Sequence, residues 1–156
     1  MLKPIAALVL GGMLALGASA AGPVSPFDGS WTLVLEKSTF RPAPGPKELT
    51  RTITTAGDSI TLTISGRRVD GSMISGRVQF RLDGKDYPLS GNPNVDTIAF
   101  TQTDARTWST TTKQAGHVRT HSTLTVSADG ATLSESISGT NASGKPVSNT
   151  MVFERR

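Results

Sequence analysis

Three polar side chains interrupt rows of apolar residues that recur at every second position of the sequence. Arg51, Glu135 and Asn149 each have an apolar residue two positions before and two positions after them. Side chains alternate between the two faces of a β-strand, so these three would share a buried face with their apolar neighbours. Hydroxyl groups have the same inward parity at Thr110, Thr112, Thr120 and Ser122. A buried charge is costly unless it is paired, so each of these residues needs an explanation.

Two explanations are open for Arg51 and Glu135. They could lie near the mouths of a barrel and reach water, or pair with one another, because long side chains extend readily to polar surroundings. They could instead line a cavity and orient a ligand, as a few placed polar groups do in a mostly apolar pocket. An inward arginine would then hold a carboxylate through two parallel hydrogen bonds. The candidate ligand-binding residues are Arg51, Leu62, Phe80, Tyr87, Phe100, Thr110, Glu135, Asn149 and Met151.

Signatures of catalysis are sparse. The chain has no cysteine, no Gly-x-Ser-x-Gly motif and no phosphate-binding loop. Tyr87, the only tyrosine, precedes Pro88 and would either cap the core at a strand end or place its hydroxyl at a cavity mouth. We therefore name no catalytic residue, although Glu135 or Tyr87 would be the acid or base if the protein were an enzyme.

The only histidines are His117 and His121. In a strand their even spacing puts both on one face about 13 Å apart, too far to share one metal ion. Val118 and Leu124 have the opposite parity and are expected to be buried, which leaves the histidines exposed. We expect no metal and no cofactor.

Most of the chain alternates between apolar and polar residues, as strands with one buried and one wet face do. Thr, Val and Ile, which are branched at Cβ, suit such strands. Pairs such as Gly57–Asp58, Asp83–Gly84 and Asp129–Gly130 predict tight hairpin turns between them. The expected strands lie near residues 31–36, 49–54, 60–64, 77–82, 87–89, 97–101, 108–112, 118–126, 133–137 and 147–153.

These strands predict an all-β fold, an antiparallel up-and-down barrel of about ten strands with little helix. Closing the sheet removes its two open edges, whereas a β-sandwich, the alternative, usually needs a long crossover. The only long connection is Lys37–Pro46, near the start. This connection is too rich in proline for a helix. Two alternatives are open: it forms a lid over one end with Phe40 beneath it, or, as is more common, Phe40 simply anchors an Ω-type loop.

The first segment has the features of a secretory signal peptide. Met1–Ala20 contains one positive charge at Lys3, an apolar run over Ile5–Leu16 and the small residues Ala18–Ala20. The run is shorter than the roughly 20 residues of a membrane span, so an anchor helix is the less favoured alternative, and we expect no transmembrane segment in the mature protein. The expected divisions are a signal peptide over 1–20, a mobile lead-in over 21–27 and a barrel over 28–156.

A resemblance enters at Gly29-Ser30-Trp31, a Gly-x-Trp at the start of the first strand. With the continuation to Phe40, the segment Asp83–Pro88 and Gly91-Asn-Pro93, the chain resembles small secreted bacterial lipocalin-like proteins. The resemblance implies that Trp31 packs under the closed end of the barrel, against a basic side chain from Arg155 or Arg156. The chain departs from secreted lipocalins in having no disulfide, no C-terminal helix and ten rather than eight expected strands.

We expect an exported, soluble barrel that binds a small apolar or amphipathic ligand in its interior, in the periplasm or outside the cell. The alternative is an envelope-associated or secreted interaction module whose barrel is filled by its own side chains; its protein partner is open. A central cavity of roughly 300 Å³ or more favours the first reading. Because the net charge is a modest +4 from scattered lysines and arginines, we expect no nucleic-acid partner.

Overall fold

A computed structural model of the chain describes residues 24–156. The predicted signal peptide over 1–20 lies outside the described residues, as does the start of the predicted lead-in. Within 24–156 no helix is long and apolar enough to cross a membrane. The strands are β1 (Gly29–Leu33), β2 (Glu48–Ala56), β3 (Ser59–Arg67), β4 (Met73–Phe80), β5 (Asp83–Pro88), β6 (Thr97–Asp104), β7 (Thr107–Gln114), β8 (His117–Val126), β9 (Thr132–Thr140) and β10 (Pro146–Arg155).

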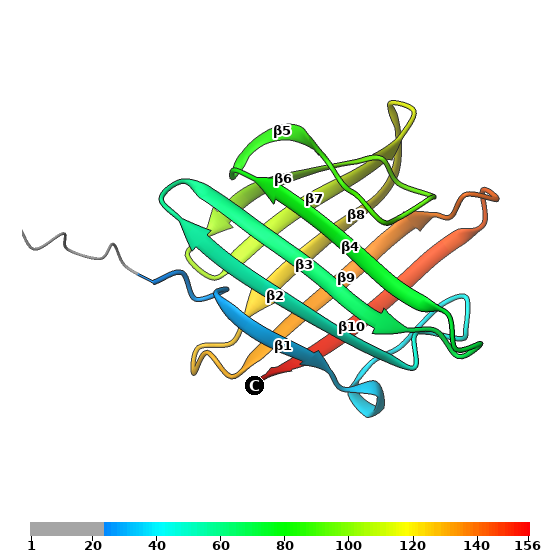
Figure 1. Cartoon of the computed structure of the whole chain (residues 1–156), viewed down its shortest axis with the longest axis horizontal. Coiled ribbons are helices and arrows are strands. Elements are labelled where there is room, and N and C mark those ends of the chain that lie inside the picture. Colours follow the sequence, from blue (N-terminus) through cyan, green and yellow to red (C-terminus); the bar gives the residue numbers. More distant parts are fainter. Residues whose placement is uncertain (1–23) are drawn as a thin grey trace, which may run out of the picture.

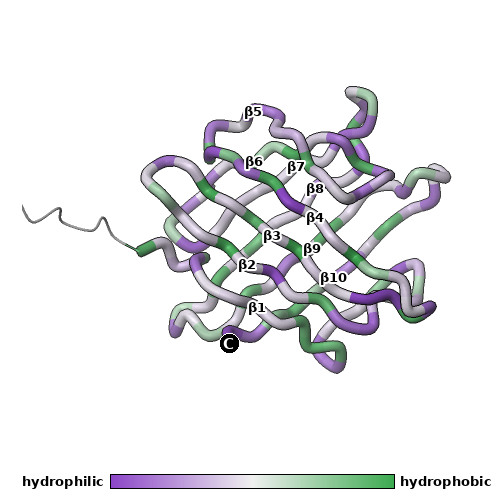
Figure 2. Tube along the Cα trace, in the orientation of Figure 1, coloured by the Kyte–Doolittle hydropathy of each residue, from purple (hydrophilic) through white to green (hydrophobic). Residues whose placement is uncertain are grey.

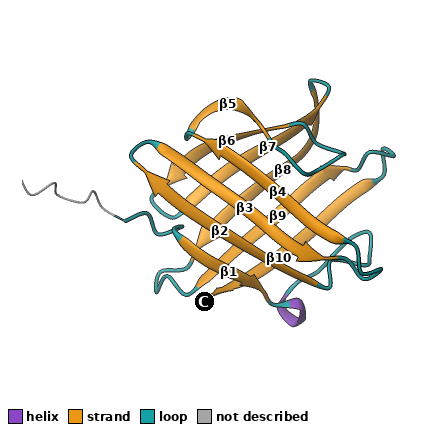
Figure 3. Cartoon of the chain, in the orientation of Figure 1, coloured by secondary structure: helices purple, strands orange, loops and turns teal. Residues whose placement is uncertain are grey.

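The predicted all-β barrel is confirmed (Figure 1). The ten strands form one antiparallel sheet in the order β4-β3-β2-β1-β10-β9-β8-β7-β6-β5. The first strand pairs with the last, which joins the two ends of the chain and excludes the sandwich. The barrel is nearly closed, because an isolated bridge between Arg77 and Ser90 joins the edge strand β4 to the segment just after the other edge strand, β5. The only helical turn in the described part is η1 (Leu35–Lys37) (Figure 3).

Two local predictions were wrong. Asp83–Gly84 does not form a tight hairpin turn; it begins β5, whose pairing with β6 shifts register between Asp83 and Asp86. Val118 is 48% exposed rather than buried. The pairing of β7 with β8 shifts after Thr112, so that Lys113 lies opposite Val118. One extra residue in a strand reverses which face later side chains occupy, and a parity count along the sequence misses it.

Aromatic rings fill one end of the barrel, which we call the closed end. The ring pairs Phe27–Trp108 and Phe80–Phe100 are both stacked with centroids 3.7 Å apart. The Trp108 ring meets Phe80 edge-on at 5.8 Å. Phe27, the last residue of the predicted lead-in, is fully buried. Figure 2 shows apolar and polar residues alternating along strands of the barrel. Successive side chains of a strand point to opposite faces, and these rings are buried.

Arg155 covers the Trp31 ring at the closed end. Its guanidinium carbon lies 4.1 Å from the centroid of the Trp31 ring, so the basic partner implied for that tryptophan is present. The same guanidinium donates hydrogen bonds to the backbone carbonyls of Asp28, Pro26 and Gly130. A cation over an indole and charged hydrogen bonds both stabilise a contact. Arg155 thus ties the last strand to the entrance of the first.

Candidate functional site

The other half of the barrel is hollow. An inner cavity of about 280 Å³ lies next to the stacked rings of Phe27, Trp108, Phe80 and Phe100, which we call the aromatic floor. Phe100 and Leu124 are among the residues that line it. The strands β2, β3, β6, β7, β8, β9 and β10 all supply inward side chains to it. The lining residues are Arg51, Leu62, Ile64, Leu89, Asn92, Val95, Ile98, Phe100, Thr110, Thr112, Thr120, Ser122, Leu124, Glu135, Ile137, Val147 and Asn149.

One wall of the inner cavity carries a continuous polar chain. The Ser122 hydroxyl donates to Glu135 Oε1 at 2.9 Å and lies 2.6 Å from the hydroxyl of Thr110. Because the single Ser122 proton is used on Glu135, Thr110 donates to Ser122. A second hydroxyl pair, Thr112 with Thr120, lies at 2.7 Å on the same two strands. The neighbouring strands β7 and β8 thus present a row of paired hydroxyls.

Arg51 extends this chain of polar contacts. It lies on β2, which is separated from β9 by β1 and β10 in the sheet. Its Nη2 lies 2.5 Å from Glu135 Oε2, and both side chains are only 8% exposed. The guanidinium passes over the Phe153 ring, 4.6 Å from its centroid. Arg51 Nε and Glu135 Oε2 have no aligned hydrogen-bond partner among the described residues, so the pair is held by charge contact. Of the two explanations open for these residues, their mutual pairing is observed, and both also border the cavity.

An outer chamber of about 440 Å³ lies beside this cavity, toward the open end of the barrel. Arg51, Ile64 and Asn149 border both spaces. The chamber lies under the connection from η1 to β2, whose residues Phe40, Pro42, Pro44, Gly45 and Pro46 line it. The two spaces are therefore adjacent, with Arg51, Ile64 and Asn149 at their boundary.

We call residues 38–46 of that connection the strap. The strap is attached to β10: Asn149 Oδ1 accepts a hydrogen bond from the backbone N–H of Arg41 at 3.0 Å, and Thr39 pairs with Thr150. Phe40 lies against Gly45, where a Cβ would come within 2.2 Å of the ring. Glycine at this position lets the strap fold back over Phe40.

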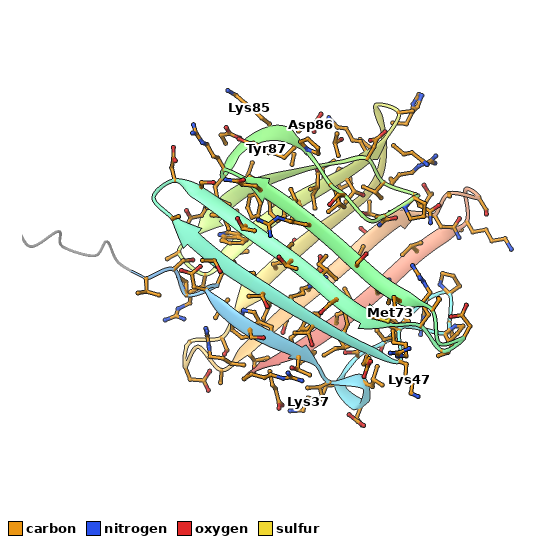
Figure 4. All side chains as sticks on the ribbon, viewed as in Figure 1. Lys37, Lys47, Met73, Lys85, Asp86 and Tyr87 are labelled. Atoms are coloured by element: carbon orange, nitrogen blue, oxygen red, sulfur yellow. The ribbon has the colours of Figure 1, made fainter. Side chains whose placement is uncertain are left out.

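Six of the predicted site residues border the inner cavity, and three do not. Met151 lines the outer chamber. Phe80 belongs to the aromatic floor. Tyr87 lies on β5 beside Lys85 and Asp86 (Figure 4), and its hydroxyl donates to Asp83 Oδ2 at 2.8 Å. Partial desolvation and this hydrogen bond raise the pKa of Tyr87. The six that border the cavity are Arg51, Leu62, Phe100, Thr110, Glu135 and Asn149.

Sequence reasoning missed the contribution of the loop between β5 and β6. Leu89, Asn92 and Val95 line the inner cavity from this loop. Parity along a strand predicts inward residues such as Ile64 and Ile98, but it says nothing of a loop that folds inward. The histidines lie apart from the cavity. His121 Nδ1 contacts the Thr111 hydroxyl at 3.1 Å, and no cluster of three metal-ligating side chains is found within 24–156.

Comparison with known proteins identifies the fold. No protein-family model and no curated protein sequence matches the chain. Among solved structures, the chain is similar to the zebrafish ileal bile acid-binding protein in complex with cholic acid, with a TM-score of 0.52 and 15% identity over 85% of this chain and 100% of that one. The redesigned β-barrel mFAP1 bound to DFHBI follows, with a TM-score of 0.45, 13% identity, and 83% and 95% of the two chains covered. EF1p2_mFAP2b bound to DFHBI has a TM-score of 0.47, 12% identity, and 84% and 94% covered.

The likeness to the bile acid-binding protein extends over that whole chain and shows a shared calycin-type barrel fold. The barrel fold implied by the lipocalin-like resemblance is therefore observed. At 15% identity the likeness concerns the fold alone.

Proposed function

We propose that this protein binds a small amphipathic molecule in its inner cavity and admits it through the outer chamber at the open end. The observation that carries the proposal is the mixed lining of the cavity. The hydroxyls and the ion pair share this lining with apolar side chains such as Leu62, Ile64 and Ile98. Pockets for small molecules combine a largely apolar lining with a few placed polar groups in this way.

The volumes define how much of a ligand fits. The inner cavity, at about 280 Å³, lies slightly below the roughly 300 Å³ at which small-molecule pockets begin. The outer chamber adds about 440 Å³. A ligand that places its polar head at the inner cavity and extends its apolar part beneath the strap would use both spaces. A barrel filled by its own side chains, as the alternative interaction module requires, would not contain these two spaces.

The shared barrel supports the proposal in a general way. The bile acid-binding protein was crystallised with cholic acid, an amphipathic molecule. For the present chain we propose the same broad class, an apolar body with polar groups, because the mixed apolar and polar lining of its own cavity fits that class.

We also propose that the ligand is met outside the cytoplasm. The pattern of Met1–Ala20, with one charge, a short apolar run and small residues at its end, supports removal after Ala20 and export. Sequencing the N-terminus of the protein purified from its host tests this. A start at Ala21 is expected, and a retained Met1 would contradict it.

Native mass spectrometry of the protein purified from its host tests the binding proposal. A co-purified molecule of defined mass is expected. The variant Ile64→Trp fills the boundary of both spaces and should abolish the adduct, whereas the control Thr63→Trp, on the opposite face of the same strand, should retain it. A wild-type protein without any adduct, or an adduct equally abundant in both variants, would favour the interaction module instead.

A further inference from the structure

We infer that the inner cavity selects ligands with an uncharged polar head, such as an alcohol or an amide, over free carboxylates. This inference rests on the proposed function and gives its ligand a chemical class. It reverses the expectation that an inward Arg51 would hold a carboxylate, and it follows from the partner that the structure gives that arginine.

The charge of the cavity wall is the first step. Among the residues that line the inner cavity, only Arg51 and Glu135 are ionisable at neutral pH. They lie 2.5 Å apart and compensate one another. The wall therefore has no net charge, and a carboxylate that enters it meets no uncompensated cation.

The guanidinium is also partly covered. Glu135 contacts its Nη2 and the Phe153 ring lies 4.6 Å from its central carbon. A ligand carboxylate that used the remaining N–H groups would lie beside the carboxylate of Glu135, which is itself only 8% exposed. Two carboxylates at one buried guanidinium repel each other, and one of them would have to take up a proton. Binding of an ionised acid at this guanidinium is therefore opposed.

Neutral polar heads meet no such opposition. The wall beside the ion pair presents the hydroxyls of Thr110, Thr112 and Thr120. Each hydroxyl has one donor and two acceptor sites, so a group already in one hydrogen bond can make another. Alcohols and amides also both donate and accept. Their transfer into the cavity removes no full charge from water, whereas an unpaired buried carboxylate loses much of its hydration energy.

A matched pair of probes, 1-decanol and decanoate, tests the inference at pH 8, where decanoate is ionised. Wild-type protein should bind 1-decanol at least tenfold more tightly in a calorimetric titration. Glu135→Gln keeps the shape of the side chain and its bond from Ser122 but frees the charge of Arg51. In this variant decanoate affinity should rise at least tenfold while 1-decanol affinity changes less than threefold. Tighter binding of decanoate by the wild type, or no gain of decanoate affinity in Glu135→Gln, overturns the inference.

Two controls keep the result interpretable. Glu154→Gln breaks the exposed pair between Lys37 and Glu154, whose side chains are 59% and 52% exposed on the outer surface, and should leave both affinities unchanged. If Glu135→Gln does not fold, the double variant Arg51→Met with Glu135→Leu removes both charges and should keep the preference for 1-decanol; a decanoate preference there contradicts the inference. A cavity that prefers decanoate sinks only this inference, whereas a protein that binds neither probe and carries no adduct from its host sinks the proposed function as well.

Discussion

The two ends of this barrel have the same alternation of inward and outward residues but very different interiors. At the closed end the inward positions carry large rings, and Phe27, Trp31 and Trp108 are at most 2% exposed. At the open end they carry hydroxyls, Asn149 and the Arg51–Glu135 pair around two spaces of about 280 and 440 Å³. Period-two alternation therefore specifies the barrel, while the size of the inward residues decides whether a given height along the barrel axis is filled or hollow.

The closed end and the open end therefore differ in what they contribute: the first to stability, the second to ligand binding. Close-packed rings contribute dispersion and hydrophobic stabilisation, and a missing ring leaves a cavity that the surroundings cannot fill. A hollow level gives up that stabilisation and gains room for a ligand. We therefore expect truncations at the closed end to act mainly on stability and changes at the open end to act mainly on binding.

The largest effect should follow from truncating the aromatic floor. Trp108→Ala removes the ring that stacks on Phe27 and meets Phe80 and Phe100 edge-on, so the free energy of unfolding should fall by about 5 kcal/mol. Phe40→Ala truncates a half-buried ring beneath the strap and should cost only about 1 kcal/mol. Urea denaturation of both variants measures the contrast. Similar losses would mean that the two ends do not differ in how they support the fold.

The ion pair should give the next largest effect, because it places two charges in a buried part of the open end. Arg51→Leu leaves the carboxylate of Glu135 without its cation, and stability should fall by about 3 kcal/mol. The double variant Arg51→Leu with Glu135→Leu removes both charges and should lie within about 1 kcal/mol of the wild type. The same denaturation measurement applies. If the single variant is as stable as the double, the pair is not carrying a buried charge.

Arg155 should rank third. Arg155→Ala removes the cation over Trp31 together with hydrogen bonds to backbone carbonyls that include those of Pro26 and Gly130. Because this side chain is exposed, we expect a loss of about 2 kcal/mol. Indole fluorescence during unfolding follows the loss at the closed end, and the affinity for a cavity ligand should stay unchanged. A change in that affinity would show that the two ends are coupled.

Sequence reasoning reached the architecture because the alternation of residues such as Ile60, Leu62 and Ile64 is local and recurs in most of the strands. It also selected Arg51 and Glu135 as inward charges, since a polar residue on an apolar face is visible without a structure. It did not show that they pair, because β2 and β9 are separated by two strands of the sheet. A contact of that kind depends on how the barrel curves.

The fine structure of the barrel was less accessible. The register shift beside Lys113 that leaves Val118 exposed adds a single residue to a strand, and no composition signal marks it. Asp83–Gly84 does not close a hairpin because β4 and β5 are the two edges of the sheet. Near this gap an isolated bridge joins Arg77 to Ser90, which follows β5. The division into a filled and a hollow end depended on which inward residues lie at the same height, which strand tilt determines.

The smallest effect tests whether the contrast between the ends is confined to the interior. Asp129, in the turn after β8, accepts hydrogen bonds from the Ser127 hydroxyl and the Ala131 N–H. Asp70, in the turn after β3 at the open end, accepts both from the Ser72 hydroxyl and its N–H. These bonds lower the pKa of both carboxyls below the usual value of 3.8.

A lowered pKa in the folded state stabilises the protein above the unfolded pKa, and this contribution is lost as the pH falls through the folded pKa. Asp129→Asn and Asp70→Asn should therefore each lower the melting temperature slightly at pH 7, and the loss should shrink as the pH falls toward 2. Because the two turns are built alike, the two losses should be equal. Thermal melts of both variants at pH 7 and pH 2 compare them, with Asp58→Asn as a control for removing an exposed turn carboxylate. A loss clearly larger for Asp129→Asn would show that the surface turns of the closed end, and not only its rings, contribute to its greater stability.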